Sequence, residues 1–162
     1  MFTLKRGMDL VIIETTRFGT LELLEDEILE FPSGILGFEE YKGYVILEIR
    51  KDGMFRCLQS TDDPDIAFVI IEPAVFWPDY QVQVEADVLA ELGAIEDPGD
   101  VVIYAIVTVP RDVTQMTANL QAPVVINRKT RRGKQVVLTD GKYHTRHPIL
   151  AQRAGQEQRK TG

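Results

Sequence analysis

The basic run NRKTRRGK, residues 127–134, is the first place where clustered side chains could do chemistry. It holds five lysines and arginines in eight residues, within a 162-residue chain of formal net charge −7. Clustered cations neutralise phosphates, which raises the possibility that this chain is a small basic-patch barrel binding RNA directly. RNA-binding surfaces also offer aromatic rings for base stacking, and this run contains none. We therefore favour a solvated hairpin tip in which Gly133 helps the chain turn.

Catalytic and metal-binding chemistry have little support in the sequence. The single cysteine, Cys57, has no signature that brings it close to His144 or His147, so we expect it to be a small buried hydrophobic residue. The two histidines are three residues apart, but Pro148 and a preceding Asp-Gly turn disfavour the helix that would place them on one face. We expect no enzyme activity, no bound metal and no cofactor.

Two loops have the composition of ligand sites without the required spacing. Residues 61–65, TDDPD, lack the alternating ligands, central glycine and final glutamate of a calcium loop, so an ordinary turn is expected. Residues 31–38, FPSGILGF, contain two glycines but lack the lysine and hydroxyl pair of a phosphate loop. Their large apolar side chains either cap the end of the fold or face a partner, and we favour burial.

Short segments rich in β-branched, aliphatic and aromatic residues make up most of the chain. Strands are expected at residues 10–15, 20–24, 27–31, 44–50, 54–59, 66–71, 80–85, 101–109, 113–119, 124–127 and 135–138. Residues 80–85, YQVQVE, alternate cleanly between polar and apolar side chains. Asp-Gly pairs at 52–53 and 140–141 predict two hairpins, and residues 86–93 are the one segment typical of a helix.

These elements predict a mainly β chain that forms one compact, closed or nearly closed antiparallel barrel-like domain with one short helix. Closure is expected because it removes the exposed edges of many short strands. We place the domain at residues 10–150, with an N-terminal extension at 1–9 and a flexible tail at 151–162, where apolar residues are almost absent. Nothing in the sequence demands an oligomer, so a monomer is expected.

The expected location is the cytoplasm. No apolar run approaches the roughly 20 residues that cross a bilayer, and the first residues lack the pattern of a signal peptide. Charge is divided unevenly along the chain: residues 1–100 contain 22 acidic and 7 basic side chains, a net of −15, whereas residues 101–162 contain 3 and 11, a net of +8. Such asymmetry favours association with charged partners.

Several motifs together resemble one family. FPSGILGF at 31–38, FRCLQS at 55–60, TANLQAPVVIN at 117–127, GKQ at 133–135 and YHTRHPI at 143–149 are similar, in order and spacing, to FliW, the flagellar assembly factor family. The resemblance covers roughly residues 10–150. It implies a non-enzymatic cytoplasmic protein with a compact β-barrel-like fold. It also implies two alternative partners: newly made flagellin and, when flagellin is scarce, the RNA-binding translational repressor CsrA, which then cannot silence the flagellin message.

The residues suggest how such a protein could act on a repressor. A protein that holds RNA displays positive potential, so an acidic surface docked beside its groove would associate quickly and repel phosphates. An apolar anchor and two polar amides near predicted strand ends could add contacts, although solvated turns would explain the same loop residues. The candidate partner-binding residues are Phe38, Glu39, Glu40, Gln59, Asp62, Asp63, Asp65 and Asn127.

Overall fold

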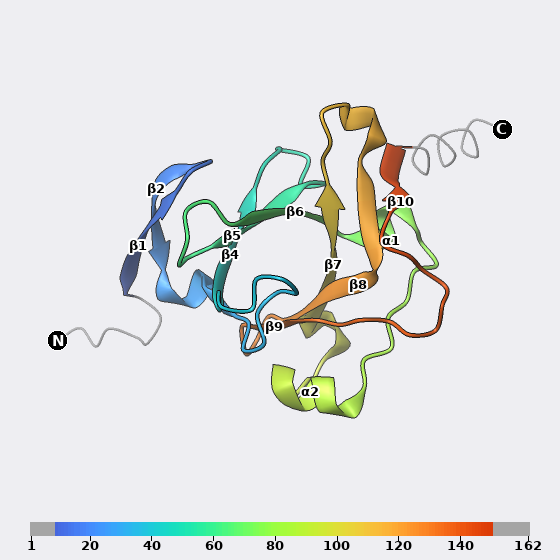
Figure 1. Ribbon diagram of the computed structural model, residues 1–162. Coiled ribbons are helices and arrows are strands. Elements are labelled where there is room, and N and C mark those ends of the chain that lie inside the picture. The colour runs from blue at the N-terminus through green and yellow to red at the C-terminus, as the bar shows by residue number, and fades with distance from the viewer. Residues whose placement is uncertain (1–8, 151–162) are drawn as a thin grey trace.

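A ring of strands closes around an apolar core in the computed structural model, which describes residues 9–150 (Figure 1). In ring order the strands are β8 (Thr117–Asn127), β7 (Val101–Thr108), β6 (Ala67–Ile71), β5 (Arg56–Ser60), β4 (Gly43–Glu48), β3 (Leu29–Glu30) and β9 (Arg132–Gln135). Neighbouring strands are antiparallel except for the parallel pair β3 and β9, and β9 closes the ring by pairing with β8 as well. The predicted closed β-barrel is confirmed. The short strand β10 (His147–Pro148) adds to the outside edge of β8.

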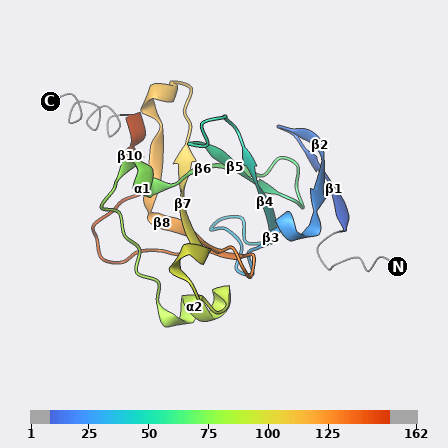
Figure 2. The same ribbon diagram turned by 180° about the vertical axis from the view of Figure 1, so that it is seen from behind.

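A two-stranded hairpin, β1 (Leu10–Thr15) and β2 (Gly19–Leu24), lies against the barrel wall (Figure 2). Side chains alternate across β4, so Tyr44 points into the barrel while Val45 packs outward against Ile13 and Leu23 of the hairpin. Inside the barrel, Phe31 meets Tyr44 edge to face with ring centroids 5.2 Å apart. The barrel wall is therefore apolar on both faces where the hairpin covers it.

Two α-helices lie wholly within the described residues, α1 (Pro73–Phe76) and α2 (Ala86–Leu92), with short 3-10 turns at Glu25–Glu27, Pro98–Asp100 and Val113–Gln115. Helix α2 is the one the sequence predicts, and it ends where Gly93 takes a φ of 87°. Helix α1 was not predicted, because one turn that begins at Pro73 has no apolar repeat to reveal it. No helix among residues 9–150 is long and apolar enough to cross a membrane.

The predicted break between strands at 113–119 and 124–127 is wrong. One continuous strand, β8, spans residues 117–127, whereas residues 113–115 of the first predicted strand form a 3-10 turn. The pairing of β8 with β7 jumps from Tyr104 opposite Val124 to Ile106 opposite Asn119. The bulge created by this jump contains Pro123, so the missing N–H of proline falls where the ladder is already interrupted. Pro123 therefore lies within a strand.

The basic run is also different from the prediction. Strand β9 begins at Arg132, inside the run, so the turn is shorter than expected and Gly133 is a strand residue. A Cβ atom at position 133 would lie 2.7 Å from Cε2 of the fully buried Phe31, so glycine is required by the close approach of the ring. The Asp-Gly pair at 52–53 does join antiparallel strands, β4 and β5, as predicted. The pair at 140–141 makes a turn, with Gly141 at φ 76°, but the chain then runs to β10 beside β8 and forms no second hairpin.

Residues 80–85 have the side-chain pattern of a strand without belonging to one. Tyr80 is buried, Gln81 and Gln83 are exposed, and Val82 and Val84 between them are half-buried, as alternation predicts. No strand within residues 9–150 pairs with this segment, so the predicted strand is wrong. The extension and tail predicted at 1–9 and 151–162 lie outside the described residues, apart from Asp9.

Candidate functional site

Two loops rich in acidic residues lie side by side at one end of β4 and β5. The Tyr41 hydroxyl donates to Oδ2 of Asp63 at 3.1 Å, and the Thr61 N–H donates to the Gly43 carbonyl at 2.9 Å. Longer contacts of 3.4 Å link Oδ2 of Asp62 to the N–H groups of Lys42 and Gly43. We call the five carboxylates that these loops carry the acidic loop pair: Glu39, Glu40, Asp62, Asp63 and Asp65.

The backbone of the acidic loop pair is fixed by hydrogen bonds from its own N–H groups. The buried Ser60 hydroxyl oxygen accepts from the N–H groups of Asp62 and Asp63 at 3.0 and 3.1 Å, and Oδ1 of Asp63 accepts from the Asp65 N–H at 2.9 Å. This confirms the turn interpretation of residues 61–65. Among the described residues no group of three or more His, Cys, Asp and Glu side chains is arranged to hold a metal ion.

The other loop depends on Gly34. Its φ is 68°, and a Cβ atom there would lie 2.6 Å from the Cα of Glu39, so only glycine fits. The Glu39 carboxylate accepts from the Gly37 N–H at 2.9 Å, and this hydrogen bond lowers the pKa of Glu39. The hydrogen bond to Asp63, helped by the charge of Glu40, raises the pKa of Tyr41. The lowered pKa of Glu39 keeps this carboxylate ionised at neutral pH.

The carboxylates of the acidic loop pair form no ion pairs among the described residues, although the charge of nearby Lys42 contributes to lowering the pKa of Glu39. Within residues 9–150, no lysine or arginine forms an ion pair with any of these five carboxylates. Glu39, Glu40, Asp62 and Asp65 are exposed and Asp63 is half-buried. The two neighbouring loops therefore carry five carboxylates, four of them exposed, as the sequence analysis expected of these residues individually.

Phe38 lies beside the acidic loop pair and is half-buried. Its ring meets Phe68 of β6 edge to face at 5.1 Å between centroids, and its N–H donates to the Ile35 carbonyl at 2.7 Å. Part of the ring serves the core and part remains accessible. Burial, the interpretation we favoured for this loop, is confirmed for Phe31 and Ile35, which are 0 and 1 % exposed.

Gln59 and Asn127, the two amides predicted to contact a partner, are both fully buried. The Gln59 amide donates to the carbonyls of Pro64 and Ile66 at 3.3 and 3.2 Å, which ties the loop of residues 61–65 to β5. A docked partner cannot reach either side chain on this surface. Both amides fit architectural roles, which sequence could not separate from binding because buried and interfacial amides look alike in one chain.

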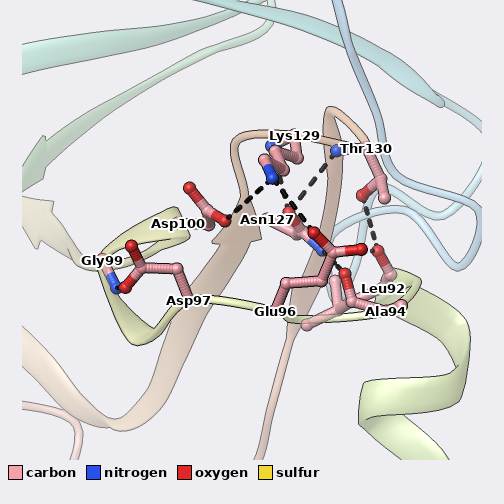
Figure 3. Close-up of polar contacts among 9 residues, drawn as sticks. All are labelled: Leu92, Ala94, Glu96, Asp97, Gly99, Asp100, Asn127, Lys129 and Thr130. Atoms are coloured by element: carbon pink, nitrogen blue, oxygen red, sulfur yellow. Dashed lines mark hydrogen bonds and ion pairs between the residues drawn. The ribbon is translucent and has the colours of Figure 1, made fainter.

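Asn127 organises residues 127–134, which we call the basic turn (Figure 3). Its amide nitrogen donates to the carbonyls of Leu92 and Ala94 at 3.2 and 3.3 Å, and its oxygen accepts from the N–H groups of Lys129 and Thr130 at 3.0 and 3.4 Å. The Thr130 hydroxyl also donates to the Leu92 carbonyl at 2.5 Å. The turn is thereby attached to the end of α2.

Two lysines of the basic turn form ion pairs with carboxylates. Lys134 lies 2.8 Å from Glu91, and Lys129 lies 3.3 Å from Glu96 (Figure 3 shows the second pair). Hydrogen bonds from Lys134 and Ser33 lower the pKa of Glu91. The neighbouring acids weaken the positive potential on which direct RNA binding would depend.

The remaining candidates for chemistry are held in structural contacts. Cys57 is fully buried, as predicted, and burial raises the pKa of its thiol, which disfavours the reactive thiolate. His144 and His147 stack with ring centroids 3.8 Å apart. Nε2 of His147 accepts from the His144 N–H at 3.0 Å, and Nδ1 of His144 accepts from the Arg146 N–H at 3.2 Å. One nitrogen of each ring is thus occupied by the loop backbone, and burial lowers the pKa of His147.

Some residues that shape the acidic surface were not singled out by the sequence. Ser60 and Tyr41 hold the two loops together, although each is an unremarkable residue in its motif. The only available signal was their position beside the acidic clusters. A side-chain hydrogen bond between residues 22 positions apart leaves no recognisable local pattern in the sequence.

Comparisons with known proteins place the chain among flagellar proteins. The family model described as FliW protein matches residues 12–149. A flagellar assembly factor FliW of Alkaliphilus metalliredigens is 44% identical over 141 residues, covering 86% of each chain. One from Treponema denticola is 40% identical over 140 residues, covering 86% of this chain and 94% of that one. A crystal structure of the flagellar assembly factor FliW superposes with a TM-score of 0.80 at 40% identity, covering 86% of this chain and 97% of the other.

Proposed function

This chain belongs to the FliW family of flagellar assembly factors, and on that premise we propose that it binds flagellin and, when free of flagellin, the repressor CsrA. Binding would antagonise the repressor and so relieve repression of flagellin translation. We further propose that the protein acts in the cytoplasm as a monomer, through protein contacts rather than catalysis, and that it neither binds nucleic acid nor associates with membranes. The partners follow from the family resemblance; the manner of binding follows from the surface of this chain.

The acidic loop pair is the observation that supports the proposed action on a repressor. It joins five carboxylates from two loops, and no described cation is paired with them. Long-range attraction between this surface and a positively charged RNA-binding protein would raise the association rate. The half-buried ring of Phe38 offers an apolar contact at its margin.

Antagonism would come from the same charge. Phosphate affinity falls steeply when local positive potential is reduced, so carboxylates held beside an RNA groove would weaken its hold on RNA. The carboxylates need no reorganisation on docking, because Ser60 and Gly34 already fix their loops. The flagellin site is a separate question, and we assign no residues to it.

Charge reversal tests the proposal. We expect the double variant Glu40→Lys with Asp62→Lys to bind purified repressor about tenfold or more weakly at low ionic strength, and to displace less RNA from it. The loss should shrink as salt is added, because exposed charges are screened. Binding is measured by titration calorimetry and RNA displacement by fluorescence anisotropy.

The matched control is the double variant Glu22→Lys with Glu48→Lys. Both residues are exposed and have the same charge; Glu22 lies on the hairpin and Glu48 at the end of β4 opposite Gly43. This control changes the net charge equally, so it separates a local surface from a general effect of charge. Equal affinity and equal RNA displacement for the two double variants would refute the role of the acidic loop pair.

A further inference from the structure

A groove of about 600 Å³ separates two segments that are distant in sequence. One wall is formed by residues 79–88, which lead from α1 into α2, and the other by residues 134–143, which follow β9. Figures 1 and 2 both show these connections on the same side of the barrel, away from the β1 and β2 hairpin. The volume is within the range of roughly 300 to 1,000 Å³ typical of binding sites.

The first wall contains an extended segment, residues 80–85, whose side chains alternate as in a strand but which pairs with no strand among the described residues. Val82 and Val84 pack against the α2 side of the core, while Gln81, Gln83 and Glu85 line the groove. Among the described residues, no hydrogen bond satisfies the backbone N–H and carbonyl groups of residues 81–84. Four successive residues thus offer unsatisfied backbone groups, which native structures usually pair with other backbone, side chains or water.

The second wall presents an open strand edge. The N–H groups of Val136 and Leu138 donate to the carbonyls of Pro123 and Gln121 in β8, at 2.9 and 2.7 Å. Because successive residues of a strand direct their backbone groups to opposite sides, those of Val137 point away from β8. Strand β3 pairs with β9 only at Arg132, and among the described residues no hydrogen bond reaches the backbone of Val137, which is 51% exposed.

We propose that this groove binds an extended segment of a protein partner, which adds as a strand between residues 81–85 and 136–139. Main-chain hydrogen bonds would give such a segment its affinity, as in other complexes formed by strand addition. The site lies outside the acidic loop pair and does not depend on its role, so each proposal can fail alone.

The charges of the groove define the occupant further. Its lining contains four carboxylates, from Asp79, Glu85, Asp87 and Asp140, but only two lysines. One of these, Lys134, is already paired with Glu91 at 2.8 Å. The segment that fits is therefore extended, largely polar and basic, with lysine or arginine alternating with residues such as threonine or valine.

Peptide binding tests the proposal on the full chain. The probe is a short capped peptide in which threonine and valine alternate between lysines, and the comparison peptide carries N-methyl groups at every second residue. We expect the first peptide to bind and to protect the amides of residues 81–84 and 137 from hydrogen exchange. N-methylation should weaken binding by about tenfold or more, because it removes main-chain donors and leaves the charge unchanged.

Val137 provides a matched pair of variants. Val137→Pro removes an N–H that makes no hydrogen bond within the described chain, so the fold should survive while peptide binding falls by about tenfold. Val137→Ala retains the N–H and should bind as the unmodified chain does. Circular dichroism and thermal denaturation confirm that both variants are folded.

Three results would overturn the proposal. The first is absence of binding by the unmodified peptide, or equal binding of the N-methylated one. The second is protection of residues 81–84 in the free chain that disappears when residues 151–162 are removed, which would assign the groove to the chain's own end. The third is protection that rises with protein concentration together with dimerisation, which would assign it to a second copy.

Discussion

In the basic turn, Lys134 lies 2.8 Å from Glu91 and Lys129 lies 3.3 Å from Glu96, whereas in the acidic loop pair no described lysine or arginine is paired with a carboxylate. Both regions are dense runs of one charge in the sequence. The fold pairs two of the five cations in the first with acids, whereas no carboxylate of the second forms an ion pair among the described residues. The difference shows that a charge run predicts surface potential only after its neighbours in space are known.

The two regions differ because they connect different parts of the barrel. The basic turn connects β8 to β9, the strand that closes the ring, and must pack against α2 and its acidic neighbours. The acidic loop pair connects strands at an open end, where backbone N–H groups and a serine hydroxyl fix the conformation. A loop organised by its own backbone leaves its carboxylates available to a partner.

The largest loss of stability is expected from Gly133→Ala, which adds a Cβ atom to the backbone of the basic turn. Alanine usually stabilises a strand relative to glycine, but here its Cβ would overlap the ring of Phe31. We expect a loss of about 2 kcal/mol in the free energy of unfolding, measured by urea denaturation. Adding Phe31→Leu should recover part of the loss, and a stabilised single variant would show that the ring can move aside.

Asn127→Ala should have the next largest effect, because it cuts the link between the basic turn and α2. The change removes two donated and two accepted hydrogen bonds and leaves the Ala94 carbonyl without a donor, while the Leu92 carbonyl keeps the Thr130 hydroxyl. A loss of about 1–2 kcal/mol in unfolding free energy is expected. Arg128→Ala, at the exposed neighbouring position, is the control. Similar losses for both would contradict the role of the amide.

A smaller effect is expected from the ion pair of Lys134 and Glu91. A double-mutant cycle with Lys134→Ala and Glu91→Gln should give a coupling of about 0.2–1 kcal/mol at neutral pH. The folded state lowers the pKa of Glu91, so this stabilisation is present above the ordinary value of 4.5 and is lost as the pH falls through the lowered value. A coupling that persists in acid would mean that packing, rather than charge, connects the two residues.

The smallest effect on stability is expected from Glu40→Gln in the acidic loop pair. Removing one of several like charges should leave the melting temperature unchanged or slightly raised, most visibly at low salt. The same variant should lower the pKa of Tyr41, because Glu40 is one of the charges that raise it. A clear fall in melting temperature would show that the carboxylate supports the fold, and would weaken the contrast with the basic turn.

The sequence alone determined most of the barrel. Alternating or fully apolar segments fixed the strands from β1 to β7, because side-chain periodicity is local, and Asp-Gly at 52–53 fixed one hairpin. The family motifs added the fold and the flagellar assignment. The acidic residues of the candidate site were also found from sequence, since loops rich in aspartate and glutamate remain on the surface.

Which of these patterns have partners depends on contacts that form only in the folded chain. The fold placed Gly133 under Phe31, buried Gln59 and Asn127, and paired the lysines of the basic turn with acids 33 to 43 residues away. It also left residues 80–85 with the side-chain alternation of a strand and no neighbouring strand. Strand pairing, burial and ion pairing depend on residues that are distant in the sequence. Side-chain periodicity and turn formation depend on residues that are close in the sequence, so they could be predicted from it.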